Sequence, residues 1–208
     1  MVGQGVLREC LLDPDVERVV ILGRTPSGQR DPKIEEIVRA DLYDITPIEP
    51  QLENLDACFF CLGVSSSGMS EADYARLTYD LTLAIATPLA RLNPQMTFIY
   101  VSGAGTDSTG KGRTMWARVK GRTENALLRL PFKAAYMFRP ALIQPMHGIK
   151  SKTKSYRLFY VFAKPFWPIL KLFPNYTTTT EQIGRAMLAA AKHGAPKPLL
   201  ESVDINRL

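Results

Sequence analysis

The 208-residue sequence contains only three cysteines and two histidines. An odd number of cysteines without a framework spacing argues against a secreted scaffold held together by disulfides. The histidines, His147 and His193, have no partners at the spacing of a metal site or a catalytic triad. No apolar run reaches the roughly 18 residues of a membrane span, and no signal peptide precedes the first expected helix. We therefore expect a cytoplasmic protein without a metal site.

Two of the cysteines, Cys58 and Cys61, form a CxxC pair inside the segment ACFFCLG. A redox pair of this kind usually lies at a helix N-terminus, and a zinc site needs a second pair. The flanking residues are those of a buried strand, so we interpret both cysteines as core residues.

The overall composition is that of an ordinary soluble protein, with 46% hydrophobic and 22% charged residues. We expect one domain, residues 1–208, without internal repeats. The net charge is +6, and its excess lies in residues 111–122 and 150–157. Such clusters attract phosphate in a dinucleotide, a nucleic acid or a lipid headgroup, or they are simply solvated. No nucleic-acid recognition motif accompanies them, so no nucleic-acid partner is expected.

Along the chain, continuously apolar segments alternate with segments whose apolar residues recur at helical spacing. Helices are expected from about residue 2 and over residues 47–53, 70–93, 114–130 and 180–192, and strands over residues 19–22, 55–63, 96–103 and 133–140, with a shorter one ending at 41. Because the strands are continuously apolar, they indicate a parallel sheet covered on both faces. Right-handed crossovers make this a doubly wound, Rossmann-type α/β layer.

Small and polar residues follow the expected strands, and in such sheets ligands collect at the strands' carboxyl ends. These strand ends are Gly23-Arg24, Asp41, Leu62-Gly63, Ser102 and Arg139-Pro140. In order and kind they resemble the short-chain dehydrogenase/reductase superfamily. Within this superfamily the chain most resembles the atypical NAD(P)-binding branch, which includes epimerase/dehydratase-like and Tat-interacting-protein-like oxidoreductases. The resemblance covers almost the whole chain.

The opening residues MVGQG resemble the end of the family's glycine-rich turn, TGxxGxxG, with Gly3 as its third glycine. On this interpretation a first strand and two glycines are absent, and Gly3 serves close packing of the helix on the sheet. The alternative is that Met1 is a true start and the helix caps the domain. The family's first strand lies between the strands that end at Arg24 and Gly63. We therefore expect these two strands to pair directly, or the chain alone to be poorly stable.

The resemblance implies a dinucleotide site at the strand ends. Arg24 stands where NAD-binding members usually carry a carboxylate, which indicates pairing with the 2′-phosphate of NADP rather than binding of NAD. Arg30 is a second candidate for this contact, and a solvated loop arginine is the alternative. The other matching positions are Asp41 and Leu42 beside the adenine, Leu62 and Gly63 along the adenosine, and Lys120 at the nicotinamide ribose. Asp41 fits equally well as the cap of the next turn.

The family's catalytic group is a serine followed by YxxxK, and the chain matches it only in part. Ser102 and Lys120 correspond to the serine and the lysine, but Trp116 stands in place of the tyrosine. An indole N–H does not titrate in the useful range and therefore cannot shuttle a proton. Either another acid serves (Tyr100, Thr114 or a bound water), or the protein binds nucleotide without the usual reduction.

Residues 147–178 are expected to cover the substrate. Within them, residues 156–173 combine aromatic and basic side chains, which is typical of a lid over the cofactor or of an interfacial membrane element. We predict an NADP-binding oxidoreductase that acts on a small carbonyl or sugar-nucleotide-like molecule. The alternatives are a catalytically silent nucleotide-binding regulatory module and a peripheral membrane or phosphate-surface binder.

Overall fold

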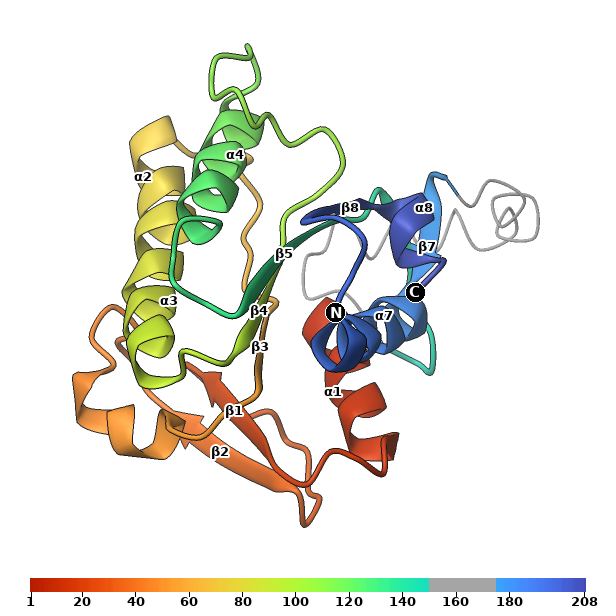
Figure 1. Cartoon of the computed structure of the whole chain (residues 1–208). Coiled ribbons are helices and arrows are strands. Elements are labelled where there is room, and N and C mark those ends of the chain that lie inside the picture. The colour runs from red at the N-terminus through yellow and green to blue at the C-terminus, as the bar shows by residue number, and fades with distance from the viewer. Residues whose placement is uncertain (150–174) are drawn as a thin grey trace.

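A computed structural model of the chain describes residues 1–149 and 175–208. Parallel strands flanked by helices form a Rossmann-type α/β fold (Figure 1), which confirms the expected fold class. The strands are β1 (Val19–Gly23), β2 (Ile34–Val38), β3 (Ala57–Phe60), β4 (Thr97–Val101), β5 (Ala134–Arg139), β6 (Leu142–Gln144), β7 (Thr177–Thr179) and β8 (Leu199–Glu201). The helices are α1 (Val2–Leu12), η1 (Thr46–Leu52), α2 (Glu71–Ala75), η2 (Arg76–Asp80), α3 (Leu81–Leu92), α4 (Met115–Leu127), α7 (Thr180–His193) and α8 (Ser202–Ile205).

Most expected elements are present, with differences in detail. The expected helix over residues 70–93 is α2, η2 and α3 in succession, and the hydroxyl of Ser70 caps it by accepting from the Asp73 amide. A π-helical turn, η2, interrupts its α-helical pattern. The expected helix over residues 47–53 is a 3₁₀ turn, η1, with prolines at its start and inside it. The hydroxyl of Thr179 caps α7, as the hydroxyl-rich sequence predicts.

The main sheet has the strand order β3-β4-β5-β8, and all its pairings are parallel. Phe60 lies opposite Tyr100, which in turn lies opposite Met137. Because the strands are parallel and in register, the carboxyl ends of β3, β4 and β5 meet at one edge. We call this edge the rim. β6 and β7 form a separate parallel pair.

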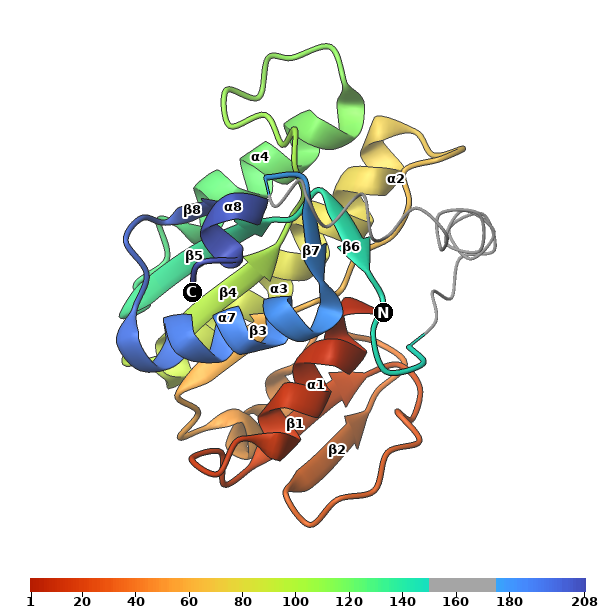
Figure 2. The same ribbon diagram turned by 90° about the vertical axis from the view of Figure 1, so that its right-hand side faces the viewer.

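The sheet is interrupted between β1 and β3. β1 pairs with β2 in a sheet of its own, and within the described parts of the chain it does not pair with β3. Of the two expected alternatives, direct pairing of these strands is therefore excluded. Helix α1 lies over the interval and contacts both strands (Figure 2). Poor stability of the chain alone stays a prediction.

Two apolar cores fill the opposite faces of the main sheet. Along β4, Phe98 belongs to one core and Ile99 to the other, because successive strand residues point to opposite faces. The first core lies under η1 and α3, and the second lies under α1 and α7. The packing of α1 on α7 depends on glycine, since a Cβ at Gly5 would lie 2.6 Å from the carbonyl oxygen of Thr180.

The cysteines are core residues. Cys58 packs against the first core and Cys61 against the second, and both thiols are unpaired. Burial raises the pKa of each of these thiols to about 12. The CxxC spacing therefore places two inert side chains on opposite faces of a strand, not a redox pair.

Candidate functional site

Ser102 and Lys120, the predicted catalytic pair, meet at the rim. Ser102 follows β4, and the Nζ of Lys120, on α4, donates a hydrogen bond to its carbonyl oxygen at 2.6 Å. The same Nζ lies 5.9 Å from the centre of the Tyr100 ring. Burial lowers the pKa of Lys120 to about 8, against the opposing effect of the Glu124 carboxylate. The amine therefore titrates close to neutral pH.

The hydroxyl of Ser102 points into the protein. It donates to Oε1 of Glu124 at 2.5 Å and lies 3.2 Å from the carbonyl oxygen of Phe138. Ser102 is only 8% exposed. Its single hydroxyl proton is thus committed to a buried carboxylate, and in this arrangement the residue faces the rim through its carbonyl group.

Glu124 is a fully buried carboxylate that the sequence analysis missed. It forms an ion pair with Nη2 of Arg139, and its Oε1 also accepts from Nε of Arg139 at 3.0 Å. This pairing raises the pKa of Arg139. A signal was available in the sequence, because Trp116, Lys120 and Glu124 recur at four-residue spacing and so share one face of α4.

Arg139, which the family pattern singled out, lies within this network and not at an open site. Its Nη2 donates to the hydroxyl of Ser108 at 2.5 Å, and its Nη1 lies 3.6 Å from Oε1 of Glu201. The residue is 9% exposed. Arg139 therefore links the ends of β5 and β8 to the loop that follows β4.

That loop, residues 103–113, packs closely on α4. A Cβ at Gly121 would lie 1.7 Å from the carbonyl oxygen of Asp107, so only glycine permits this approach. The carboxylate of Asp107 accepts from the hydroxyl of Thr109 and from the amide of Gly112, both at 2.6 Å, and these bonds lower its pKa.

Trp116, which the resemblance aligns with the tyrosine of the short-chain dehydrogenases, packs on the same loop. A Cβ at Gly105 would lie 3.7 Å from its ring. Tyr100 does not replace the missing acid, because it is 1% exposed and burial raises its pKa. Thr114 is exposed and precedes α4, and its side chain makes no capping hydrogen bond.

The segment after β3 offers an open apolar surface at the rim. A Cβ at Gly63 would have no atom within 4 Å, and the flanking Leu62 and Val64 are 40% and 37% exposed. Gly3 lies beside this segment, since a Cβ on it would come within 3.3 Å of the Cβ of Cys61. This contact agrees with the packing role expected of Gly3.

The remaining predicted cofactor residues differ in their surroundings. Arg24 is exposed, and within the described residues its guanidinium has no hydrogen-bond or ion-pair partner. Asp41 is exposed, and its Oδ1 accepts from the Tyr43 amide at 2.8 Å. It thus caps the next turn, which is the alternative to a position beside the adenine. Leu42 is 2% exposed and packs in the first core, so its side chain has a structural role. Of the predicted residues, Ser102 and Lys120 are the pair in direct contact.

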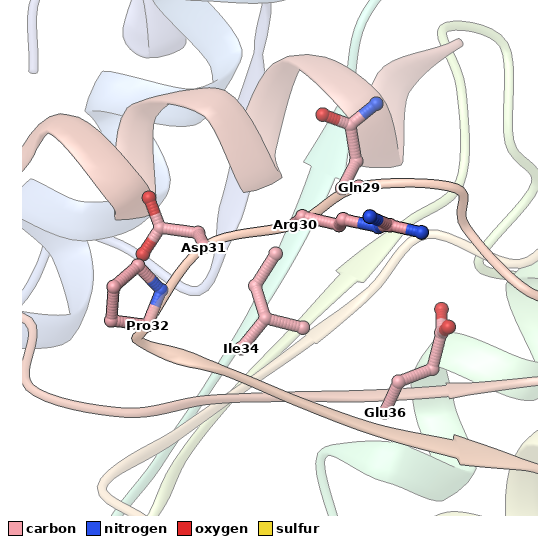
Figure 3. A pocket seen from close by; sticks show the side chains of 6 residues that line it. All are labelled: Gln29, Arg30, Asp31, Pro32, Ile34 and Glu36. Atoms are coloured by element: carbon pink, nitrogen blue, oxygen red, sulfur yellow. The ribbon is translucent and has the colours of Figure 1, made fainter.

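A recess of about 540 Å³ lies away from the Ser102–Lys120 pair (Figure 3). Its lining consists of Gln29, Arg30, Asp31, Pro32, Ile34 and Glu36. It is formed by the loop between β1 and β2 and by the start of β2. A second, of about 320 Å³, is lined by Tyr79, Arg122, Asn125, Ala126 and Arg129. Neither recess includes a residue at the carboxyl end of β3, β4 or β5. The candidate site is therefore identified by the Ser102–Lys120 contact at the rim and not by a recess.

The described residues contain neither a metal-binding cluster nor a membrane-spanning helix. In residues 1–149 and 175–208, no group of three or more histidine, cysteine, aspartate or glutamate side chains could hold a metal ion. Over the same residues, no helix has the length and apolarity needed to span a membrane. Of the expected substrate-covering segment, 147–178, the structure describes residues 147–149 and 175–178. The segment 156–173, for which a lid or a membrane contact is predicted, lies wholly outside the described residues.

No protein-family model and no curated protein matches the sequence. Solved structures match its fold. Glucuronic acid dehydrogenase from Chromohalobacter salexigens has a TM-score of 0.63 at 12% identity, and the match covers 96% of this chain and 72% of that one. The Bordetella bronchiseptica enzyme WbmG, in complex with NAD and UDP, has a TM-score of 0.67 at 10% identity, covering 96% and 68%.

A third match is an oxidoreductase of the short chain dehydrogenase/reductase family from Burkholderia thailandensis. Its TM-score is 0.62 at 14% identity, and the match covers 96% of this chain and 85% of that one. The chain therefore has the fold of these enzymes, as the resemblance of its strand ends predicts. At such identities the likeness describes the fold alone.

Proposed function

We propose that the protein is an NADP-dependent oxidoreductase of the short-chain dehydrogenase kind, acting on a small carbonyl or sugar-nucleotide-like substrate. The observation that carries this proposal is the contact between Lys120 and Ser102 at the carboxyl end of β4. A lysine whose pKa is about 8 in that place is suited to proton transfer at neutral pH. Structures of the same fold contain NAD, and one also contains UDP.

The residues at the rim fit a dinucleotide. Leu62, Gly63 and Val64 offer an exposed apolar surface for a flat ring, with open space where a Cβ of Gly63 would lie. Arg24 follows β1, which lies outside the main sheet; its guanidinium has no hydrogen-bond or ion-pair partner among residues 1–149 and 175–208, and it can pair bidentately with a 2′-phosphate, which favours NADP over NAD. We assign Gly3 to the packing of α1 beside this surface, and Asp41 to the turn near the adenine.

When bound, the reduced nicotinamide supplies a hydride to a carbonyl carbon, and the carbonyl oxygen then needs a proton. Trp116 cannot provide it, and Tyr100 is buried. We assign the proton to the ammonium group of Lys120, which has three N–H donors and gives one of them to the Ser102 carbonyl. Ser102 is thus a positioning residue, whose carbonyl group fixes the amine at the rim.

The test is NADPH consumption with a panel of aldehydes, ketones, uronic acids and sugar nucleotides. We expect turnover with at least one class, and a rate that falls as the pH rises through about 8, because the acid form of Lys120 is lost. Lys120→Gln should abolish turnover, whereas Lys111→Gln, at an exposed lysine, should not change it. The proposal fails if NADPH binds but no substrate is reduced at any pH.

A second candidate is a catalytically silent nucleotide-binding module. Two observations favour it: Trp116 stands in place of the tyrosine, and the hydroxyl of Ser102 is committed to Glu124. This candidate predicts NADPH binding without turnover. If Trp116→Tyr then produced turnover, the chain would be an enzyme that has lost its usual acid.

A further inference from the structure

The smaller of the two recesses, of about 320 Å³, follows one face of α4. Four of its five lining residues recur at helical spacing along α4 and the turn after it: Arg122, Asn125, Ala126 and Arg129. Trp116, Lys120 and Glu124 lie on the opposite face of this helix, because residues spaced by three, four and seven share a face. The fifth lining residue, Tyr79, comes from η2, in the neighbouring helical layer (Figure 1). The recess is therefore separate from the rim.

The lining of this recess carries positive charge without a counter-charge. It contains two arginines and no carboxylate. Arg118, four residues before Arg122, has its counter-charge in Glu71 at 2.6 Å. Among residues 1–149 and 175–208, by contrast, neither Arg122 nor Arg129 forms an ion pair, even with the nearby Asp80. Two guanidinium groups that border the same space and lack carboxylates are suited to an anionic ligand.

Arg122 is held in place from two sides. Its guanidinium carbon lies over the Tyr79 ring, 5.6 Å from the ring centre. Its stem packs against the loop over residues 103–113, where a Cβ at Gly110 would lie 3.7 Å from its Cγ. A guanidinium that rests on an aromatic face keeps its N–H donors available at its edge. Because the side chain is already ordered, it loses less conformational freedom when it binds an anion.

The other residues of the recess supply neutral donors and a small apolar surface. Nδ2 of Asn125 donates to the carbonyl oxygen of Ser108 at 2.8 Å, which fixes the amide group and leaves its second N–H available. Within the described parts of the chain, the Tyr79 hydroxyl has no hydrogen-bond partner. Ala126 contributes only a methyl group. The volume is at the small end of the range for small-molecule sites, roughly 300–1,000 Å³.

We propose that this recess, which we call the arginine recess, binds a small organic phosphate. The phosphate group pairs with Arg122 and Arg129, and the organic part lies on Ala126 and the edge of Tyr79. A phosphate monoester suits two guanidinium groups better than a carboxylate does, because it carries a charge of about −1.5 to −2 and three acceptor oxygens at pH 7. The inference does not depend on the proposed function, since no residue of the arginine recess lies at the rim.

The test is a titration of the 208-residue chain with phenyl phosphate, followed by the NMR shifts of its backbone amides. We expect saturable shifts at residues 79 and 122–129, and weaker binding of inorganic phosphate. Arg122→Gln should weaken the binding of phenyl phosphate by about tenfold, because charged hydrogen bonds are lost. Arg122→Lys should have an intermediate effect, since it keeps the charge but not the two-pronged geometry.

Arg207→Gln is the matched control. Arg207 is exposed in the turn after α8, outside the arginine recess, so this change removes the same charge from the chain without touching the proposed site. The affinity for phenyl phosphate should stay within about twofold at 0.1 M salt, where distant charges are screened. The midpoint of thermal unfolding of each variant shows that it is folded.

Three outcomes would overturn the proposal. The first is equal weakening by Arg122→Gln and Arg207→Gln, which would mean that the anion responds only to net charge. The second is shifts confined to residues 62–64 and 102–105, which would place the phosphate group at the rim. The third is equal affinity for phenyl phosphate and inorganic phosphate, which would mean that the arginine recess does not recognise an organic part.

Discussion

At the scale of single residues, the decisive feature is the burial of Glu124 with Arg139. Charges removed from water are costly, and the pair is tolerated because hydrogen bonds from Ser102 and Arg139 satisfy both carboxylate oxygens. The same bonds turn the Ser102 hydroxyl away from the rim. The residue that looks catalytic in the sequence therefore also serves the structure.

Glu124→Gln tests this network. The neutral amide removes the buried counter-charge of the Arg139 guanidinium and leaves it the more exposed Glu201 carboxylate at 3.6 Å, so the free energy of unfolding should fall by about 3 kcal/mol. Urea unfolding followed by circular dichroism measures the change. Glu17→Gln is the matched control, because Glu17 is exposed, and its effect should stay within about 0.5 kcal/mol. Equal effects of the two changes would mean that the buried pair contributes nothing.

The three thiols provide a second test at this scale. Burial raises the pKa of Cys10, Cys58 and Cys61 to about 12. At pH 8 the thiolate fraction is then on the order of one in ten thousand, and the thiolate is the reactive form. We expect no reaction of the native protein with Ellman's reagent within minutes and three thiols titrated in denaturant. Rapid reaction of a native thiol would show that its site is open.

At the scale of elements, the approach of α4 to the loop over residues 103–113 positions Lys120. Gly121→Ala would place a methyl group against the carbonyl of Asp107 and force the helix and loop apart. We expect a loss of about 1–3 kcal/mol in unfolding free energy, measured by urea unfolding. Gly23→Ala is the control, because its methyl group would meet the nearest atom at 3.5 Å. Similar stabilities for the two variants would show that the loop simply moves aside.

The elements also show what the sequence can predict. Strands β1, β3, β4 and β5 and the longer helices follow from apolar runs and helical periodicity. β2 contains two glutamates and ends at Val38, three residues before the expected end at Asp41. β6, β7 and β8 have three residues each, which is too short for any period to register. The resemblance of MVGQG predicts the missing neighbour of β1, but not that β1 and β2 form a sheet of their own. The four-residue spacing on α4 indicates which helix face carries Glu124, but its partner, 15 residues away, is a tertiary contact that no local pattern contains.

At the scale of the whole molecule, the stability of the fold should depend on the charge of Lys120. Its pKa falls from 10.5 to about 8 on folding. Between these values the unfolded chain binds more protons than the folded one, so this group makes the unfolding free energy rise with pH. The unfolding free energy of Lys120→Met should exceed that of the wild type most clearly near pH 7, and this difference should disappear by about pH 10. Urea unfolding of both proteins at the two pH values measures it, and a difference independent of pH would refute the shifted pKa.

The central claim is that the rim binds a phosphorylated pyridine dinucleotide. The most direct test is calorimetric titration of the protein with NADPH and with NADH. We expect saturable binding of NADPH and weaker binding of NADH. This preference should be lost in Arg24→Ala but not in Arg129→Ala, which changes an exposed arginine in the turn that follows α4. No saturable heat from either nucleotide at millimolar concentration would contradict the claim.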